Sequence, residues 1–85
     1  MIKSWSDGAW DDYLYWQTQD RKTFKRINAL IRDVESGDPF EGIGKPEPLR
    51  YGLAGKWSRR IDEANRLIYA IEGDTIRIYS CKDHY

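Results

Sequence analysis

A stretch rich in glycine and proline, from Gly37 to Pro48, divides the sequence into two halves that differ in hydrophobic period. Apolar residues before it recur at the three- and four-residue spacing of a helix face, whereas apolar and polar residues after it alternate as in strands. A chain of 85 residues has room for one hydrophobic core and not for two. The sequence therefore predicts a single α/β domain over residues 1–85, with two helices packed on one face of a small antiparallel sheet.

The first residues predict a short strand followed by a helix. The segment from Ile2 to Trp5 is apolar enough for a strand, and Ser6 followed by Asp7 has the composition of a helix N-terminus. The helix that follows has an apolar stripe that we expect in the core, namely Ala9, Trp10, Tyr13, Leu14 and Gln17, with Trp16 beside it.

A second helix is expected to begin at Asp20 and to end before Gly37. The connection between the two helices is so short that they must form an antiparallel pair or a sharp elbow. The predicted buried face of the second helix consists of Phe24, Ile27, Leu30, Ile31 and Val34, and its outer face of Arg21, Lys22, Lys25, Arg26 and Arg32.

The second half of the chain is predicted to form a C-terminal antiparallel meander. Residues 57–62 and 66–71 alternate as two strands of a hairpin, and Gly73 with Asp74 forms a two-residue connection to a third strand at residues 75–81.

Two arginines of this meander are predicted to point away from the core. Because the helices must cover the apolar face of the sheet, we expect the second face to be basic and open. Arg60 and Arg66 fall on this second face, opposite the positions Trp57, Ile61, Leu67, Tyr69 and Ile71.

Charge and cysteine content exclude several classes of protein. The 14 basic residues balance 14 acidic ones, which argues against broad, nonspecific binding of nucleic acid, although residues 21–32 and 45–66 form basic blocks. With one thiol and one imidazole the chain can form neither an internal disulfide nor a structural zinc site, so Cys81 is expected to be simply a small buried residue. No apolar run approaches the roughly 20 residues that span a bilayer, and the sequence predicts a cytoplasmic protein.

The remaining chemically active residues suit the cleavage of RNA without a metal or other cofactor. Attack of a ribose 2′-hydroxyl on its own phosphate needs a base, cations for the developing negative charge and an acid for the leaving oxygen. Glu47 between two prolines, the arginines of the sheet and His84 could meet these needs, and the ring of Tyr85 could stack on a base. Each residue also has a simpler interpretation as an exposed acid, a solvated strand position or a frayed chain end.

Several motifs resemble one known family. They are WDDYLYW at residues 10–16, PFEGIGKPEPL at 39–49, WSRRI at 57–61, NRLIYA at 65–70 and the terminal HY. Together they are similar to the YoeB toxins of bacterial type II toxin-antitoxin systems, within the RelE superfamily, from Trp5 to Tyr85.

The resemblance implies a small α/β ribonuclease with the RelE-like toxin fold. Such an enzyme cuts messenger RNA in the ribosomal A site and is held inactive by a YefM-like antitoxin. The resemblance also makes operator DNA a partner through the antitoxin complex, and it leaves a homodimer open.

The same resemblance assigns roles to individual residues. It makes Glu47 the general base, Arg66 the residue that steadies the phosphate and His84 the general acid, while Tyr85 supports the substrate or the shape of the site. It also places Lys45, Arg50 and Arg60 where basic residues help to bind RNA.

Two positions depart from the family pattern. The basic residue after KPEPL is often Lys and here is Arg50, which replaces a point charge with a planar fork. The tail more often has Arg and an aromatic residue before His-Tyr, where this chain has Lys82 and Asp83. A carboxylate at Asp83 would favour the imidazolium form of His84 if its side chain turned the same way.

Two other functions remain open at this point. One is a non-catalytic nucleic-acid-binding module or co-repressor, in which basic residues only contact phosphates. The presence of Glu47 and His84 argues against it, since a phosphate binder gains nothing from an acid among its arginines. The other is a protein-interaction domain that docks partners on the open sheet face and leaves RNA intact.

Overall fold

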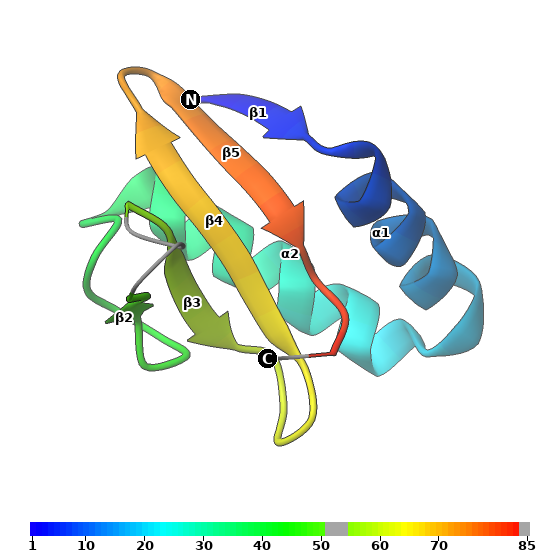
Figure 1. Cartoon of the computed structure of the whole chain (residues 1–85). Coiled ribbons are helices and arrows are strands. Elements are labelled where there is room, and N and C mark those ends of the chain that lie inside the picture. Colours follow the sequence, from blue (N-terminus) through cyan, green and yellow to red (C-terminus); the bar gives the residue numbers. More distant parts are fainter. Residues whose placement is uncertain (51–54, 84–85) are drawn as a thin grey trace.

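The computed structural model describes residues 1–50 and 55–83, which form a five-stranded sheet with two helices packed on it. The strand order is β1-β5-β4-β3-β2, and α2 crosses behind the strands while α1 stands beside the β1–β5 edge (Figure 1). The elements are β1 (Ile2–Trp5), α1 (Asp7–Gln19), α2 (Arg21–Ser36), β2 (Glu47–Pro48), β3 (Trp57–Arg60), β4 (Arg66–Glu72) and β5 (Thr75–Ser80).

The sheet is mixed, which refines the predicted antiparallel sheet. Strands β2 to β5 pair antiparallel, as hairpin-linked neighbours must, but β1 pairs parallel with β5. Nearly the whole chain lies between these two strands, so no tight turn dictates their relative direction. The predicted α/β class, the N-terminal strand and the C-terminal meander are confirmed.

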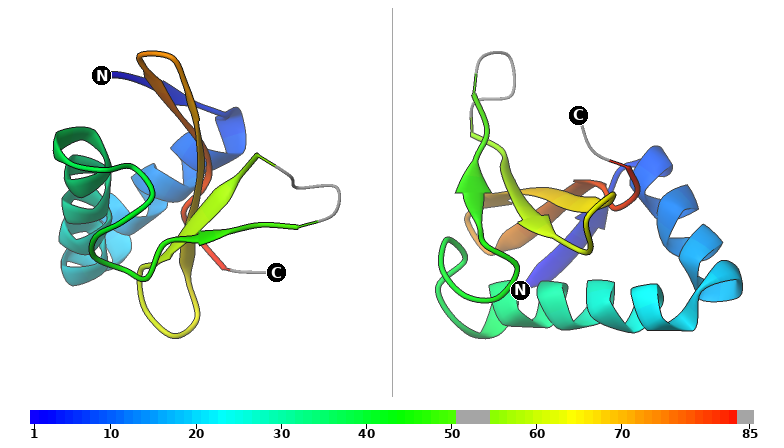
Figure 2. Two further views of the ribbon diagram at one scale, coloured as in Figure 1. Left: turned by 90° about the vertical axis from the view of Figure 1, so that its left-hand side faces the viewer. Right: turned by 90° about the horizontal axis from the view of Figure 1, so that it is seen from below.

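Helix α1 begins where predicted, but fewer of its residues are buried than predicted. The Ser6 hydroxyl accepts a hydrogen bond from the amide of Ala9 at 3.0 Å, which caps the helix. Ala9 is fully buried, whereas Trp10 and Leu14 remain 44% and 41% exposed and Gln17 is also exposed. The prediction that these three residues lie in the core is wrong, because α1 stands beside the sheet and presents only a narrow side to it (Figure 2).

Helix α2 supplies most of the helical part of the core. The Asp20 carboxylate accepts hydrogen bonds from the amides of Lys22 and Thr23 and from the Thr23 hydroxyl. The bond from the Thr23 hydroxyl, and after it those from the two amides, lower the pKa of Asp20. The chain turns sharply at this cap, so that the helices meet in an elbow, one of the two predicted arrangements (Figure 2). The predicted face Ile27, Leu30, Ile31 and Val34 is buried, and Phe24 is half-buried.

The meander forms with the predicted turn and the predicted helix-facing side. Gly73 has a φ of +56°, which allows the two-residue connection between Glu72 and Thr75. Leu67 and Tyr69 of β4 are fully buried against the helices. Ile68 and Ala70, on the opposite face, are also buried, at 3% and 8% exposure. The expectation that this face is basic and open is therefore wrong at its middle, where Ile68 and Ala70 are apolar and buried.

Cys81 follows β5 and is fully buried, as predicted. Burial, with a smaller contribution from Asp12, raises the pKa of its thiol to about 12. No helix in residues 1–50 and 55–83 is long and apolar enough to cross a membrane.

Candidate functional site

The register of the sheet brings three of the predicted site residues to one face. Glu47 of β2 pairs with Ser58 of β3, and Arg60 of β3 pairs with Arg66 of β4. Directly paired residues and residues two apart on a strand share a face, so Glu47, Arg60 and Arg66 all point away from the helices. Glu47, near the end of the stretch rich in glycine and proline, belongs to a two-residue strand, which gives its side chain a definite direction.

These three residues lie on three neighbouring strands. Because β3 lies between β2 and β4, and Glu47 pairs two residues away from Arg60 along β3, the backbones that carry Glu47 and Arg66 are about 12 Å apart. Glu47 and Arg60 are exposed and Arg66 is half-buried. The register thus places one acidic and two basic residues on the same face of three neighbouring strands.

Arg66 is held in place by the turn that precedes it. Its Nη1 donates to the backbone carbonyl of Asp62 at 2.6 Å, to that of Asn65 at 3.1 Å and to that of Glu63 at 3.3 Å. The turn itself is closed by the Asp62 carboxylate, which accepts bonds from the amides of Ala64 and Asn65. The guanidinium therefore lies at the end of the sheet where the β3–β4 turn begins.

The segment that leads to the C-terminus is bonded to the same turn. The Asp83 amide donates to Oδ1 of Asn65 at 2.6 Å, and the Asp83 carbonyl accepts from the amide of Arg66 at 2.9 Å. The chain thus passes beside Arg66 at the last described residue. His84 and Tyr85, the predicted general acid and supporting ring, lie outside the described residues.

Helix α1 also holds this C-terminal segment. Nε1 of Trp16 donates to the carbonyl of Cys81 at 2.8 Å, and Oδ2 of Asp12 accepts from the Cys81 amide at 3.1 Å. The Asp83 side chain is 80% exposed and lies 3.5 Å from Nζ of Lys82. The proposed effect of Asp83 on His84 stays a prediction.

The other predicted RNA-binding residues flank β2. Lys45 precedes the strand with a φ of +50°, and Arg50 follows it, and both side chains are exposed. The backbone around them is fixed, since the carbonyl of Gly44 accepts from the Arg60 amide at 2.6 Å and the amide of Leu49 donates to the Lys56 carbonyl at 2.8 Å.

Sequence reasoning missed Arg59 and the pair formed by Lys56 and Tyr79. Arg59 is fully buried on the helix-facing side of β3. The alternation of side chains along the strand places it on the same side as Trp57, but it predicts no role for it. Nζ of Lys56 lies 4.2 Å from the centre of the Tyr79 ring, in a cation–π contact. The alternation of side chains along a strand already placed Lys56 on the same face as Ser58 and Arg60, so the position of Lys56 could have been predicted from the sequence.

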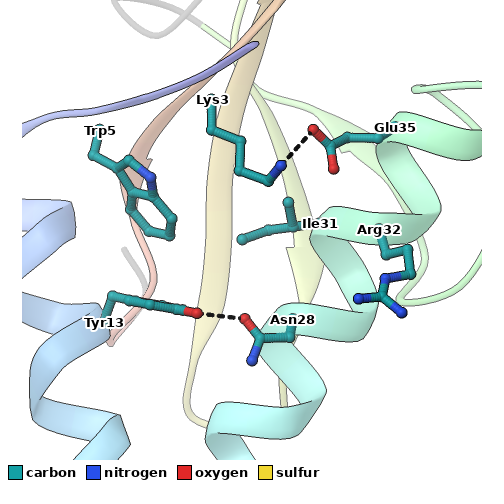
Figure 3. A pocket seen from close by; sticks show the side chains of 7 residues that line it. All are labelled: Lys3, Trp5, Tyr13, Asn28, Ile31, Arg32 and Glu35. Carbon is teal, nitrogen blue, oxygen red and sulfur yellow. Dashed lines mark hydrogen bonds and ion pairs between the residues drawn. The ribbon is translucent and has the colours of Figure 1, made fainter. Parts of the chain in front are cut away.

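A pocket elsewhere in the molecule contains none of the predicted site residues. It has a volume of about 340 Å³ between β1 and the two helices (Figure 3). Inside it, Nζ of Lys3 lies 3.0 Å from Oε2 of Glu35, and the Tyr13 hydroxyl donates to Oδ1 of Asn28 at 2.7 Å. Within residues 1–50 and 55–83, no cluster of three or more His, Cys, Asp and Glu side chains could hold a metal ion.

The family described as YoeB-like toxin of bacterial type II toxin-antitoxin system matches residues 5–85. The chain belongs to this family. Toxin YoeB of Escherichia coli K12 is 54% identical over 81 residues, 95% of each chain, and Toxin YoeB of Streptomyces coelicolor is 48% identical over the whole of both.

Solved structures agree with this assignment to the YoeB family. A YoeB/ParE toxin from Agrobacterium tumefaciens has a TM-score of 0.96 at 41% identity, with both chains fully covered. A YoeB–YefM complex from Staphylococcus aureus contains a chain with a TM-score of 0.94 at 41% identity, covering all of this chain and 98% of that one. The resemblance and the fold predicted from the sequence are confirmed, and this chain is a toxin of a toxin-antitoxin system.

Proposed function

We propose that this YoeB-family toxin is an endoribonuclease that cuts messenger RNA in the ribosomal A site and so stops translation in the cytoplasm. The observation that carries the proposal is the common face of Glu47, Arg60 and Arg66. A carboxylate is costly to place among cations that only bind phosphate, but it is needed where a hydroxyl must lose its proton. The shared face therefore favours a nuclease over the co-repressor alternative.

In the proposed reaction the ribose 2′-hydroxyl oxygen attacks the neighbouring phosphorus. Glu47 takes the hydroxyl proton, while Arg66, with Arg60 beside it, stabilises the negative charge that builds up on the phosphate oxygens. The bond from phosphorus to the 5′-oxygen breaks, and His84 gives that oxygen a proton. The products are a 2′,3′-cyclic phosphate and a 5′-hydroxyl, and no metal ion or other cofactor takes part.

Three further residues are assigned supporting roles in the proposal. Tyr85 supports the substrate or the shape of the site, and Lys45 and Arg50, on either side of β2, contact the RNA backbone. The exposure of Lys45 and Arg50 supports such contacts, since both side chains are accessible from solvent.

The partners are proposed by analogy with the family. The Staphylococcus aureus relatives include YoeB–YefM complexes and a YoeB dimer. We propose that a YefM-like antitoxin neutralises this chain, that the complex binds operator DNA, and that the ribosome presents the message. A homodimer of the free toxin is the state that the dimeric relative supports.

The decisive experiment incubates the protein with ribosomes programmed with a defined message and maps the new 5′ ends. We expect cleavage in the A-site codon, with 5′-hydroxyl and 2′,3′-cyclic phosphate ends, in excess chelator under conditions that keep the ribosome intact. A message with a 2′-deoxyribose at the scissile position should bind and stay whole. Cleavage of that analogue, or a 3′-hydroxyl product, would exclude the mechanism.

A matched variant tests the base. Glu47→Gln keeps the size of the side chain and removes its ability to take a proton, so the cleavage rate should fall by about 10² to 10⁴. Ribosome binding should change little, because binding depends mainly on the basic residues. Unchanged cleavage by this variant would remove Glu47 from the reaction.

A further inference from the structure

The side chain of Arg59 is fully buried, although charged side chains are almost never buried without partners. Its Nη1 lies 2.5 Å from Oδ2 of Asp33, and its Nε donates to the Tyr69 hydroxyl at 3.1 Å. Four backbone carbonyls also accept from its two terminal nitrogens: Asp38 at 3.4 Å, Pro39 at 3.2 Å, Glu41 at 2.9 Å and Ile43 at 3.1 Å. Six acceptors for the five N–H groups of a guanidinium leave it fully bonded.

These bonds hold together the loop formed by residues 38–44, which we call the clasp loop. Other contacts close it around the same ion pair: the Tyr69 hydroxyl donates to the Pro39 carbonyl at 2.6 Å, and the Ile43 amide donates to the Asp33 carboxylate at 3.2 Å. Gly42 has a φ of +126°, and a Cβ there would lie 2.1 Å from Oδ2 of Asp33. The clasp loop therefore passes too close to the Asp33 carboxylate for a side chain at that point.

The clasp loop ends three residues before Glu47 and determines how the chain enters β2. Strand β2 has two residues and pairs with β3 alone, so its own ladder can contribute little to its position. Arg59 sits between Ser58, which pairs with Glu47, and Arg60, whose amide donates to the last carbonyl of the clasp loop. The backbone of Arg59 thus belongs to the site's own strand, while its side chain organises the loop behind that strand.

We propose that Arg59 is a positioning residue, which through Asp33 and the clasp loop sets the Glu47 carboxylate at its working distance from Arg60 and Arg66. The inference rests on the proposed nuclease function. Arg59 itself contacts no substrate, because none of its surface is exposed. A planar guanidinium is needed for this task, since a lysine ammonium in the same space could not donate hydrogen bonds to all four carbonyls at once.

A role in stability alone would give a different pattern. Replacing a buried ion pair with apolar groups is often neutral or stabilising, so stability by itself does not require Arg59. Misplacing a catalytic group by about 1 Å can cost about 10²-fold in rate without weakening substrate binding. The maximal rate, the half-saturating concentration and the position of the loop therefore need to be measured separately.

The experiment compares Arg59→Lys with Arg77→Lys, which alters an exposed arginine that lies 2.8 Å from Glu72 on the same sheet. Cleavage on programmed ribosomes gives the maximal rate and the toxin concentration of half-saturation, and thermal unfolding shows that each variant is folded at the assay temperature. We expect Arg59→Lys to lower the maximal rate about 10²-fold with the half-saturating concentration within about threefold of wild type. Arg77→Lys should match wild type in both.

Two further measurements distinguish positioning from a general loss of structure. In a Glu47→Gln background, Arg59→Lys should lower the rate no further, because there is no longer a base to position. Amide exchange of Ile43 should speed up at least about tenfold in Arg59→Lys and stay unchanged in Arg77→Lys. If Arg59→Lys does not fold, Tyr69→Phe removes one hydroxyl from the same network and should show a smaller effect in the same direction.

The outcomes separate this inference from the proposed function. A folded Arg59→Lys or Tyr69→Phe variant with the wild-type maximal rate would overturn the inference. It would also be overturned if the rate of the double variant Arg59→Lys with Glu47→Gln fell by the product of the two single losses. If the wild-type protein itself cuts no message, the proposed function fails. The exchange of the Ile43 amide would then still test whether Arg59 holds the clasp loop, and unchanged exchange would overturn that part on its own.

Discussion

The backbone amide of Arg66 donates a hydrogen bond to the carbonyl of Asp83 at 2.9 Å. Strand β4 therefore carries the proposed phosphate-binding arginine and also holds the residue that precedes His84. Chain ends are usually frayed because few contacts hold them, yet this one is bonded to Arg66, Asn65, Trp16 and Asp12 as far as Asp83. An end held this firmly is suited to carry a catalytic group.

His84→Ala should lower the cleavage rate by about 10² to 10⁴, the usual contribution of a positioned general acid. Removal of both His84 and Tyr85 should cost at least as much, because a stacking ring adds about 1 to 3 kcal/mol of substrate binding. The melting temperature and the antitoxin affinity should barely change. A protein that ends at Asp83 and still cuts messages at the wild-type rate would show that His84 is idle.

Asn65→Ala should release the C-terminal segment while leaving His84 and Arg66 in the chain. The Asn65 side chain accepts from the Asp83 amide and donates to the Asp62 carboxylate at 3.0 Å. Its loss removes hydrogen bonds that are only partly buried, so the free energy of unfolding should fall by about 1 kcal/mol. The cleavage rate, measured well below the melting temperature, should fall about tenfold or more, because the general acid is less well placed.

A matched control for Asn65→Ala is Asn28→Ala. Asn28 is a half-buried amide that accepts a bond from Tyr13 at 2.7 Å. Its replacement should also reduce stability but leave the rate unchanged. Equal rate losses in the two variants would mean that the effect of Asn65 comes from stability alone.

Charge reversal at Arg60 and Arg66 should weaken binding of both the antitoxin and the ribosomal substrate. An acidic antitoxin segment that covers this face would pair with the guanidinium groups that otherwise contact phosphate. Arg60→Glu with Arg66→Glu should raise both dissociation constants by about tenfold or more in calorimetry and ribosome pelleting. The control is Arg32→Glu, on the exposed face of α2. An unchanged antitoxin affinity in the double variant would mean that the antitoxin binds to another surface.

Stability should depend on pH through Asp33. The hydrogen bond from Arg59, and after it that from the Ile43 amide, holds the pKa of the Asp33 carboxyl below its usual value of 3.8. A lowered pKa in the folded state means that this contribution is fully present above pH 3.8 and is lost as the pH falls through the lower, folded value. Urea unfolding between about pH 5 and pH 2 should show the loss in wild type.

Asp33→Asn should remove this part of the pH dependence, because the amide does not titrate. Below pH 4, the slope of its unfolding free energy against pH should be smaller than that of wild type, and the difference should correspond to the titration of about one carboxyl group. An identical slope in wild type and variant would mean that Arg59 does not stabilise the ionised form of Asp33.

Much of the fold followed from local patterns in the sequence. The change of period near Gly37, the caps at Ser6 and Asp20 and the turn at Gly73 depend on neighbouring residues, so they could be recognised without a tertiary structure. The face shared by Arg60 and Arg66 also followed from alternation. Glu47 and His84 were found from their chemistry and from the family motifs, and their roles stay predictions.

Tertiary structure alone decided the features that depend on distant partners. Strand β2 is a strand only because β3 lies beside it, and two residues have no period of their own to recognise. Trp10 and Leu14 lie about 100° and 140° around α1 from Ala9, and which part of this broad apolar stripe is buried depends on where α1 stands relative to the sheet. The alternation of β3 placed Arg59 on the inner face, but only the folded chain brings Asp33 and the clasp loop carbonyls around it, since those acceptors come from residues 16 to 26 positions away.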